Sequence, residues 1–243
     1  LSTTGLTDLV PGTSVTLRWT ISNGGCGSNS DDVTITNNEL PTTAAAGSDQ
    51  TICNITTATL SANAPTVGTG SWSVIAGSAT ITSPNSPTSG LTGLIAGTSV
   101  TLRLTISNGT CTNSTDDVVI TIDQNGTTAN AGPDQNLCNT TTATMSANSA
   151  GVGTGLWTVV TGTATITTPT LSTTGITGLI QGSAVTLRWT IVNGTCPNST
   201  DDVTITISEP ATVADAGVDQ NLCNQTIATL AANTATVGIG TWS

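Results

Sequence analysis

The stretch GSAVTLRWTIVNGTCPNSTDDVTITI, residues 182–207, decides the fold of this chain. Apolar and polar residues alternate over 185–191 and again over 202–207, which predicts two β-strands that each bury one face. The Asn193-Gly194 pair between these runs is a strong turn signal. The residues expected to face inward are Val185, Leu187, Trp189, Ile191, Val203, Ile205 and Ile207, with Thr186, Arg188 and Thr190 facing outward.

The residues that precede this stretch read as further strands. Over 140–147 the alternation places Ala143, Met145 and Ala147 on one face, and over 156–160 it places Trp157 and Val159 inward. No segment shows helical spacing, and turn residues recur every eight to twelve positions. Six or seven short strands of this kind predict an all-β fold, an antiparallel β-sandwich of immunoglobulin-like plan with a tryptophan on its third strand.

The same pattern recurs along the chain with a period of about 85 residues, which indicates a string of small domains because solenoid repeats are shorter. The period relates all of the arginines, all of the cysteines and three of the tryptophans: Arg18, Arg103 and Arg188; Cys26, Cys111 and Cys196; Cys53, Cys138 and Cys223; Trp72, Trp157 and Trp242. Catalytic sites normally occur once, so the recurrence favours a structural or adhesive array.

The repeat divides the chain into four pieces. With the AGxDQ motif as the start, they are a partial sandwich repeat over 1–45, whole repeats over 46–130 and 131–215, and a partial repeat over 216–243. Because the first and last pieces each hold only part of a repeat, we expect the chain to be a section of a longer polymer. Any targeting segment would then lie outside it.

The composition argues against several kinds of function. The formal net charge is −11, and the chain contains no His, Lys, Tyr or Phe. Without lysines to neutralise phosphates, we expect no nucleic acid partner. No apolar run approaches the length of a membrane span, so we expect no membrane insertion. A Ser or Thr nucleophile would lack its usual basic activator, so we expect no enzyme.

Five segments carry a resemblance to a known class of repeats. They are AGPDQNLC (131–138), ATMSAN (143–148), GTGLWTVV (153–160), GSAVTLRWTIVNGTC (182–196) and DDVTITI (201–207). Together they resemble the PKD-like and Ig-like tandem repeats of large secreted surface proteins of Bacteroidota, including gliding-adhesin-type proteins exported by type IX secretion. The resemblance implies a spacer, stalk or adhesin. The chain departs from it in lacking the GDG-type motif of typical PKD domains.

The periodic cysteines indicate an oxidising, extracellular or cell-surface setting. Three disulfide pairings fit their number. The first is within each repeat, as Cys53–Cys111 and Cys138–Cys196; the second joins neighbouring repeats, as Cys53–Cys196; the third crosses each linker, as Cys26–Cys53, Cys111–Cys138 and Cys196–Cys223. The within-repeat pairs are the first choice, although strand topology places their cysteines at opposite ends of a sandwich.

Acidic residues suggest a metal site as one hypothesis. Asp116, Asp117, Asp201 and Asp202 open the last strand of a repeat, while Asp49 and Asp134 precede the first strand. If these neighbouring strands brought the carboxylates together, the oxygen ligands would suit calcium as the one cofactor. The alternative is ordinary turn chemistry and solubilising charge at strand ends, with no cofactor at all.

The sequence therefore predicts a non-enzymatic extracellular structural protein, a stiff multi-domain rod or filament on a bacterial surface. Its main partner would be itself, through neighbouring repeats or as a homopolymer. The alternative is the repeat region of a cell-surface adhesin that binds a surface glycan or protein. Binding faces are usually rich in exposed aromatic residues and arginine, and this chain has few of either.

Overall fold

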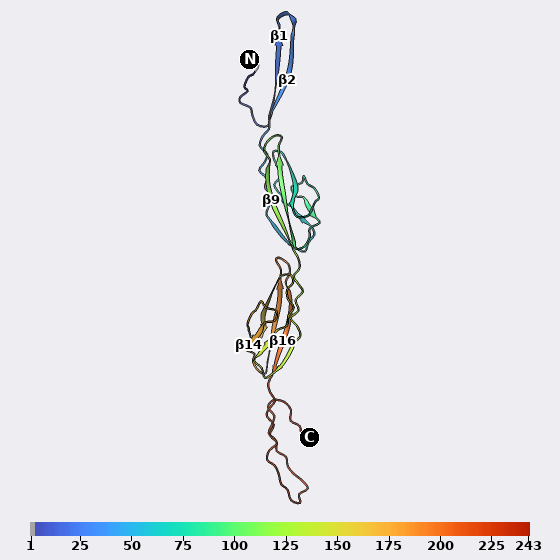
Figure 1. Cartoon of the computed structure of the whole chain (residues 1–243), viewed down its shortest axis with the longest axis vertical. Coiled ribbons are helices and arrows are strands. Elements are labelled where there is room, and N and C mark those ends of the chain that lie inside the picture. The colour runs from blue at the N-terminus through green and yellow to red at the C-terminus, as the bar shows by residue number, and fades with distance from the viewer. Residues whose placement is uncertain (1–2) are drawn as a thin grey trace. The chain divides into compact units, whose positions relative to one another are not determined.

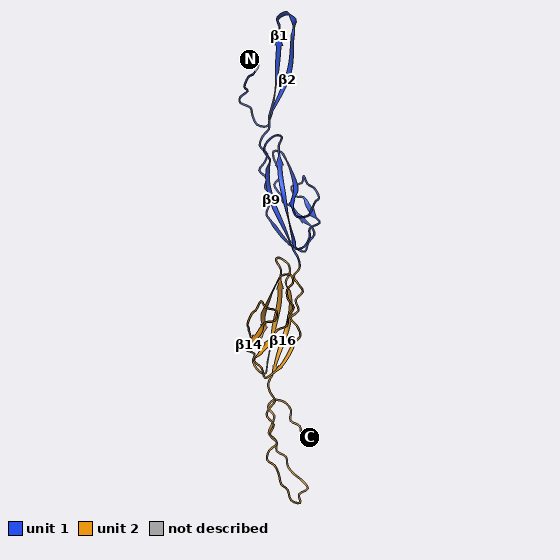
Figure 2. Cartoon of the chain, viewed as in Figure 1, with its two compact units in different colours: residues 1–124 blue, residues 125–243 orange. Residues whose placement is uncertain are grey.

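The computed structural model describes residues 3–243 and is all-β (Figure 1). Within these residues the helical structure is limited to one 3-10 turn, Gly24–Cys26. The chain divides into two compact units, residues 1–124 and 125–243 (Figure 2). The expected all-β sandwich architecture is confirmed, and each unit is described by itself below.

Unit 1 begins with an antiparallel hairpin of β1 (Thr13–Ser22) and β2 (Ser28–Asn37). Seven strands follow: β3 (Gln50–Cys53), β4 (Ala58–Thr59), β5 (Thr69–Ala76), β6 (Thr80–Ile81), β7 (Gly90–Thr92), β8 (Thr98–Ser107) and β9 (Ser114–Asp123). They form two sheets, in the orders β3-β9-β8-β5 and β4-β7-β6. The first strand, β3, pairs parallel to the last, β9, and the other pairs are antiparallel.

Unit 2 repeats this plan. Its strands are β10 (Gln135–Cys138), β11 (Thr142–Thr144), β12 (Thr154–Thr161), β13 (Thr165–Ile166), β14 (Gly175–Thr177), β15 (Ser183–Val192) and β16 (Ser199–Ser208). They form sheets in the orders β10-β16-β15-β12 and β11-β14-β13, again with a parallel first and last strand. Every strand except β11 starts one repeat period after its counterpart in unit 1.

The inward faces of the two long strands are confirmed. Val185, Leu187, Trp189 and Ile191 on β15 are all at most 2% exposed, and so are their neighbours on β16, Val203, Ile205 and Ile207. Together with Trp157 and Met145 they form the core of unit 2, to which Ala129, in the segment before the AGxDQ motif, also belongs. A matching cluster around Trp72 forms the core of unit 1 and includes Ala44.

Two details of the strand predictions are wrong. The strand expected over 140–147 is regular only over Thr142–Thr144. Met145 and Ala147 are buried as expected, and their N–H groups donate to the carbonyls of Thr174 and Ser172. Val159 is 38% exposed instead of buried. It lies on β12, which is the edge strand of its sheet, and the ladder shifts at a bulge between Val159 and Thr161. An edge strand beside a bulge is covered on fewer sides than a central strand.

The glycine of the AGxDQ motif has a structural role. Gly132 has φ +86°, and a Cβ atom there would lie 2.8 Å from the carbonyl oxygen of Ser146. A residue with a side chain would therefore be strained by both its backbone conformation and this close approach.

The third-strand tryptophan is expected to dominate the stability of its unit. Trp157 is 1% exposed, and its indole Nε1 donates to the carbonyl of Ser172 at 3.2 Å. Trp157→Ala should lower the free energy of unfolding of unit 2 by about 3–5 kcal/mol, measured by urea denaturation. The neighbouring Leu156→Ala is the control, because Leu156 is 44% exposed. Equal losses for both variants would contradict the assignment of the core.

Candidate functional site

The first recurring feature is an ion pair across the two long strands. Arg188 on β15 lies opposite Asp202 on β16. Its Nε and Nη2 atoms donate to the two carboxylate oxygens at 2.7 and 2.9 Å. The same bidentate pair joins Arg103 to Asp117, at 2.7 and 2.8 Å. In both pairs the hydrogen bond from the guanidinium lowers the pKa of the aspartate below its ordinary value. These pairs tie the outer faces of the strands together.

The second recurring feature is a pair of aspartates that hold the start of each sandwich onto its last strand. Asp201 on β16 accepts a hydrogen bond from the buried backbone N–H of Ala131 at 2.7 Å. In the opposite direction, Asp134 accepts from the N–H of Thr204 at 2.8 Å. Asp116 and Asp49 make the same two bonds in unit 1, at 2.7 and 2.9 Å. We call these two bonds the aspartate cross-tie.

The cross-tie corrects the calcium hypothesis. β3 and β9 are neighbours as expected, but their register places Gln50 opposite Ile120. The carboxylate of Asp49 therefore accepts a hydrogen bond from the N–H of Val119, three positions beyond Asp116. Asp117 instead forms an ion pair with Arg103. In unit 2, Asp134, Asp201 and Asp202 likewise have three separate partners, the Thr204 N–H, the Ala131 N–H and Arg188. Within residues 3–243, no three acidic, histidine or cysteine side chains gather into a group that could hold a metal ion.

The cysteines also depart from the first expectation. Cys53 and Cys196 are disulfide-bonded, whereas Cys26, Cys111, Cys138 and Cys223 are free thiols. The structure therefore contains neither the Cys53–Cys111 nor the Cys138–Cys196 pair, and none of the cross-linker pairs.

No disulfide forms within a repeat because the first and last strands pair parallel, which places the two cysteines at opposite ends of the last strand. Cys53 lies opposite Asp123, at the end of β9, whereas Cys111 precedes the start of that strand at Ser114. A strand of about nine residues spans about 30 Å, far more than the roughly 7 Å between Cα atoms that a disulfide allows. In unit 2, Cys138 lies opposite Ser208 while Cys196 precedes Ser199, so the same argument applies.

A third feature, which the sequence did not indicate, is a junction in unit 1 between the end of the hairpin and the β8–β9 turn. The Asn108 side-chain amide donates to the carbonyl of Glu39 at 2.8 Å. The Cys111 thiol donates to the same carbonyl at 3.3 Å, and the Asn38 amide donates to the Thr110 hydroxyl at 3.4 Å. We call this set the junction. Its acceptors are mainly backbone carbonyls, which carry no sequence signature. The Asn108-Gly109 pair, which supplies one donor, predicts a turn but not the contact to Glu39.

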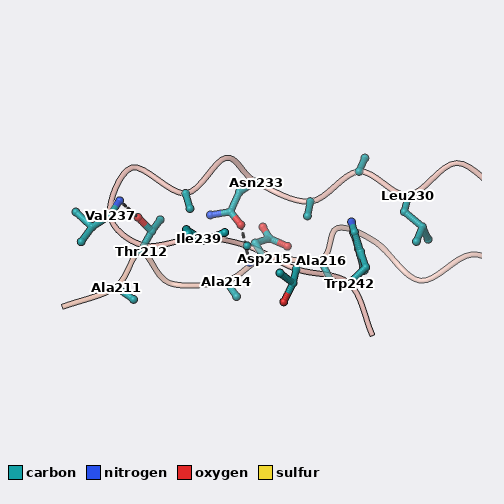
Figure 3. Close-up of a pocket in the computed structure, with 15 residues that line it drawn as sticks. Ala211, Thr212, Ala214, Asp215, Ala216, Leu230, Asn233, Val237, Ile239 and Trp242 are labelled. Atoms are coloured by element: carbon teal, nitrogen blue, oxygen red, sulfur yellow. Dashed lines mark hydrogen bonds between the residues drawn. The ribbon is translucent and has the colours of Figure 1, made fainter.

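One cavity lies within the segment 211–242 of unit 2. It has a volume of about 520 Å³ and is lined by residues that include Leu230, Ile239 and Trp242. Figure 3 shows two hydrogen bonds between residues that line the cavity. The Asp215 N–H donates to the Asn233 side chain at 2.9 Å, and the Val237 N–H donates to the Thr212 hydroxyl at 2.8 Å. The lining of the cavity mixes apolar side chains with the polar side chains of Thr212, Asp215, Asn233 and Thr241.

The solved structures that this chain resembles are Ig-like and PKD domains. No known protein family and no curated protein matches the chain. Among solved structures, it is similar to extracellular domains 3–5 of Drosophila OTK, with 8% identity over 82% of this chain and 72% of that chain and a TM-score of 0.40.

Two further structures illustrate the likeness. The Ig1–Ig2 pair of DIP-gamma has 10% identity over 70% of this chain and 98% of that chain, with a TM-score of 0.38. The PKD domain of the KIAA 1837 protein has 21% identity over 38% of this chain and 92% of that chain, with a TM-score of 0.30. At these identities the likeness concerns the fold alone. Separately, none of the helical structure in residues 3–243 is long and apolar enough to cross a membrane.

The cross-tie predicts unequal roles for two adjacent aspartates. Asp201→Ala leaves the buried Ala131 N–H without its acceptor, which should lower the free energy of unfolding of unit 2 by about 1–3 kcal/mol. Asp201→Asn retains an acceptor oxygen and should restore most of the loss. Asp202→Ala is the matched control, because its ion pair is solvent-exposed and should contribute much less. Urea denaturation measures all three, and an Asp202→Ala loss equal to that of Asp201→Ala would contradict the cross-tie.

The ion pair predicts a particular dependence on pH. The pKa of Asp202 is lower in the folded state because Arg188 hydrogen-bonds its carboxylate. Its contribution to stability is therefore fully present above the unfolded pKa of about 3.9, and is lost as the pH falls through the lowered folded value. Asp202→Asn should flatten the fall in stability of unit 2 between about pH 5 and pH 2. Arg188→Gln should have the same effect, and the double variant should add nothing. An unchanged pH profile in these variants would show that the Arg188–Asp202 pair does not cause the loss of stability at low pH.

Proposed function

We propose that this chain is a non-enzymatic extracellular structural protein whose tandem sandwiches form a stiff multi-domain rod or filament. The observation that supports this most directly is that hydrogen bonds fix the residues that connect the hairpin to the sandwich in unit 1. Asn38 and Glu39 belong to the junction, and the Thr42 N–H donates to the carbonyl of Val67 at 3.1 Å. Only Leu40 and Pro41 lie between them, and proline has a restricted φ.

The residues after Thr42 are held as well. The Ala44 N–H donates to the Ser114 hydroxyl at 2.8 Å, and the Asn63 amide donates to the carbonyl of Thr43 at 2.9 Å. In unit 2, Ala129 and Asn148 make the equivalent bonds at 2.8 and 2.9 Å. The segment before each sandwich is therefore part of its sheet packing and does not behave as a free linker. A connection with so few free dihedral angles favours a stiff rod.

We place the rod on a bacterial surface, as the resemblance to gliding-adhesin-type repeats implies. Disulfide-bonded Cys53 and Cys196 support an oxidising environment outside the cytoplasm. The recurring features are an ion pair, a cross-tie and an apolar core, which are elements that stabilise a fold. An array of repeated, self-contained sandwiches suits a load-bearing or spacing role.

We further propose that Cys53 and Cys196 pair with each other and so link one repeat covalently to the next. This is supported by their disulfide state and by the free thiols of the other four cysteines. Peptide mapping of the unreduced chain should find one peptide that joins Cys53 to Cys196, together with four thiols that react with iodoacetamide. A peptide joining Cys53 to Cys111 would contradict the proposal.

The rod itself is tested by electron microscopy of the native material. We expect straight, unbranched particles with one regular axial step per repeat. Flexible strings of beads with variable angles between successive repeats would contradict the stiff rod and would leave a flexible tether as the role of the array.

A second candidate function, a repeat adhesin, is favoured by one observation. Exposed β-branched residues recur at equivalent positions: Ile75 and Ile95 in unit 1 are 49% and 55% exposed, and Val160 and Ile180 in unit 2 are 44% and 56% exposed. Exposed apolar side chains that recur at equivalent positions could contact a glycan or protein. Binding of the full chain to a glycan array, reduced by Ile95→Ser and Ile180→Ser together, would favour the adhesin over a purely structural role.

A further inference from the structure

The sandwich of unit 2 contains a pocket beside its edge strand β12 that is almost closed in unit 1. Its volume is about 390 Å³, which is within the range of about 300–1,000 Å³ that is common for small-molecule sites. Residues 149–150, 153–155 and 170–172 line it, together with Trp189 of β15. All of them belong to the complete repeat 131–215. We call this the edge pocket.

Proline side chains fill the equivalent place in unit 1. The space that remains there is about 10 Å³, which is roughly the room of one water molecule. Pro65 and Pro87 both line it. Their counterparts one repeat later are the smaller residues Ala150 and Ser172. The edge pocket is therefore a property of the residues of unit 2 and is not common to the fold.

A buried tryptophan brings an unpaired donor to the wall of the edge pocket. Trp189, which replaces Leu104 of unit 1, is 1% exposed, and its indole Nε1 makes no hydrogen bond within residues 3–243. The other tryptophan of this core, Trp157, donates its Nε1 to the carbonyl of Ser172 at 3.2 Å. Buried polar groups in folded proteins are nearly always hydrogen-bonded, so the Trp189 donor calls for an acceptor.

Gly155 provides the space for this indole ring. A Cβ atom at Gly155 would overlap the Trp189 ring, whereas at Gly70, its counterpart in unit 1, it would lie 3.6 Å from Cδ1 of Leu104. The Trp189 ring therefore packs directly against the backbone of β12, the edge strand of its sheet. Because Gly155 also lines the edge pocket, the ring extends from the core to the wall of that pocket.

The rest of the lining is neutral and rich in hydroxyl groups. These hydroxyls belong to Ser149, Thr154, Thr170 and Ser172. Each can both donate and accept a hydrogen bond. Leu171, which is 50% exposed, adds an apolar surface beside them, and none of the lining residues carries a charge. This combination suits a neutral ligand in which hydroxyl groups alternate with C–H groups.

We propose that the edge pocket binds a neutral carbohydrate. Sugar hydroxyls would exchange hydrogen bonds with the four protein hydroxyls, and one sugar oxygen would accept from the Nε1 of Trp189. The C–H groups of the sugar ring would lie against Leu171. An anionic ligand would meet no cation in the lining and would be repelled by the net charge of −11. The inference goes beyond the proposed rod, because it assigns a ligand to one of its repeats.

The test is isothermal titration calorimetry of the full chain with defined oligosaccharides. Isomaltohexaose and cellohexaose represent the polysaccharides of a surface matrix, and lacto-N-neotetraose represents the neutral glycans of animal cells. We expect at least one of them to bind at one site per chain, and the one that binds distinguishes the two sources. Hexagalacturonic acid, which is anionic, should not bind. No binding by any neutral probe, or equal binding of the anionic one, would overturn the proposal.

Substitutions taken from unit 1 assign the binding to the edge pocket. Ala150→Pro together with Ser172→Pro should fill the pocket and weaken binding at least tenfold. The fold of unit 1 accommodates both prolines, and the Ser172 carbonyl that accepts from Trp157 is retained. Leu171→Ser, at a half-exposed position that is serine in unit 1, should also weaken binding and leaves the core untouched. Unchanged affinity in both variants would overturn the proposal.

Two controls separate this site from other surfaces. Leu156→Ser, which introduces the unit 1 residue on the outward side of β12, should bind as the unmodified chain does, because Leu156 does not line the edge pocket. The double variant Ile95→Ser and Ile180→Ser should also bind normally. Loss of binding in this double variant would place the ligand on the recurring apolar positions and would overturn the edge pocket as its site. None of these outcomes bears on the stiffness of the rod, so the two proposals can fail separately.

Discussion

The structure depends on the parallel pairing of the first and last strands of each sandwich. In unit 1 this pair is short, Gln50–Cys53 against Ile120–Asp123. The aspartate cross-tie extends it, since Asp116 and Asp49 each bind a backbone N–H of the opposite segment. Because the cross-tie holds Ala46, it also fixes where the chain enters the sandwich. The position of the preceding residues, and so of the connection to the previous repeat, follows from that constraint.

A carboxylate suits this role because of its position at the edge of the core. Ala46 and Ala131 are both 1% exposed, so their N–H groups need an acceptor that water cannot supply. Leaving a buried N–H donor unpaired destabilises the fold by more free energy than a typical hydrogen bond contributes. The aspartate therefore stabilises the fold mainly by keeping this donor paired. The neighbouring arginine–aspartate pairs lie on the exposed face and are screened by solvent. Two adjacent aspartates on one strand thus have different functions, decided by the face to which each belongs.

The fold could be predicted from the sequence because strand periodicity is simple. Alternation over 185–191 assigned every inward residue of β15 correctly, since the side chains of a strand alternate strictly between its faces. The same reasoning was wrong for Val159, where a bulge and an edge position intervene. The cysteine pairing and the calcium hypothesis depended on the register between β3 and β9, which periodicity does not report. The junction at Glu39 uses a backbone carbonyl as its acceptor, and every residue has one.

The central claim is that the connection between repeats is ordered by its contacts. It is tested most directly by ¹⁵N relaxation of the backbone amides of Asn38, Glu39 and Leu40. The account predicts order parameters of about 0.85, equal to those of strands β2 and β9. The Asn108→Ala variant, which removes the hydrogen bond to Glu39, should lower them at these three residues and leave β9 unchanged. Values below about 0.6 in the unmodified chain would show a flexible connection and would contradict the stiff rod.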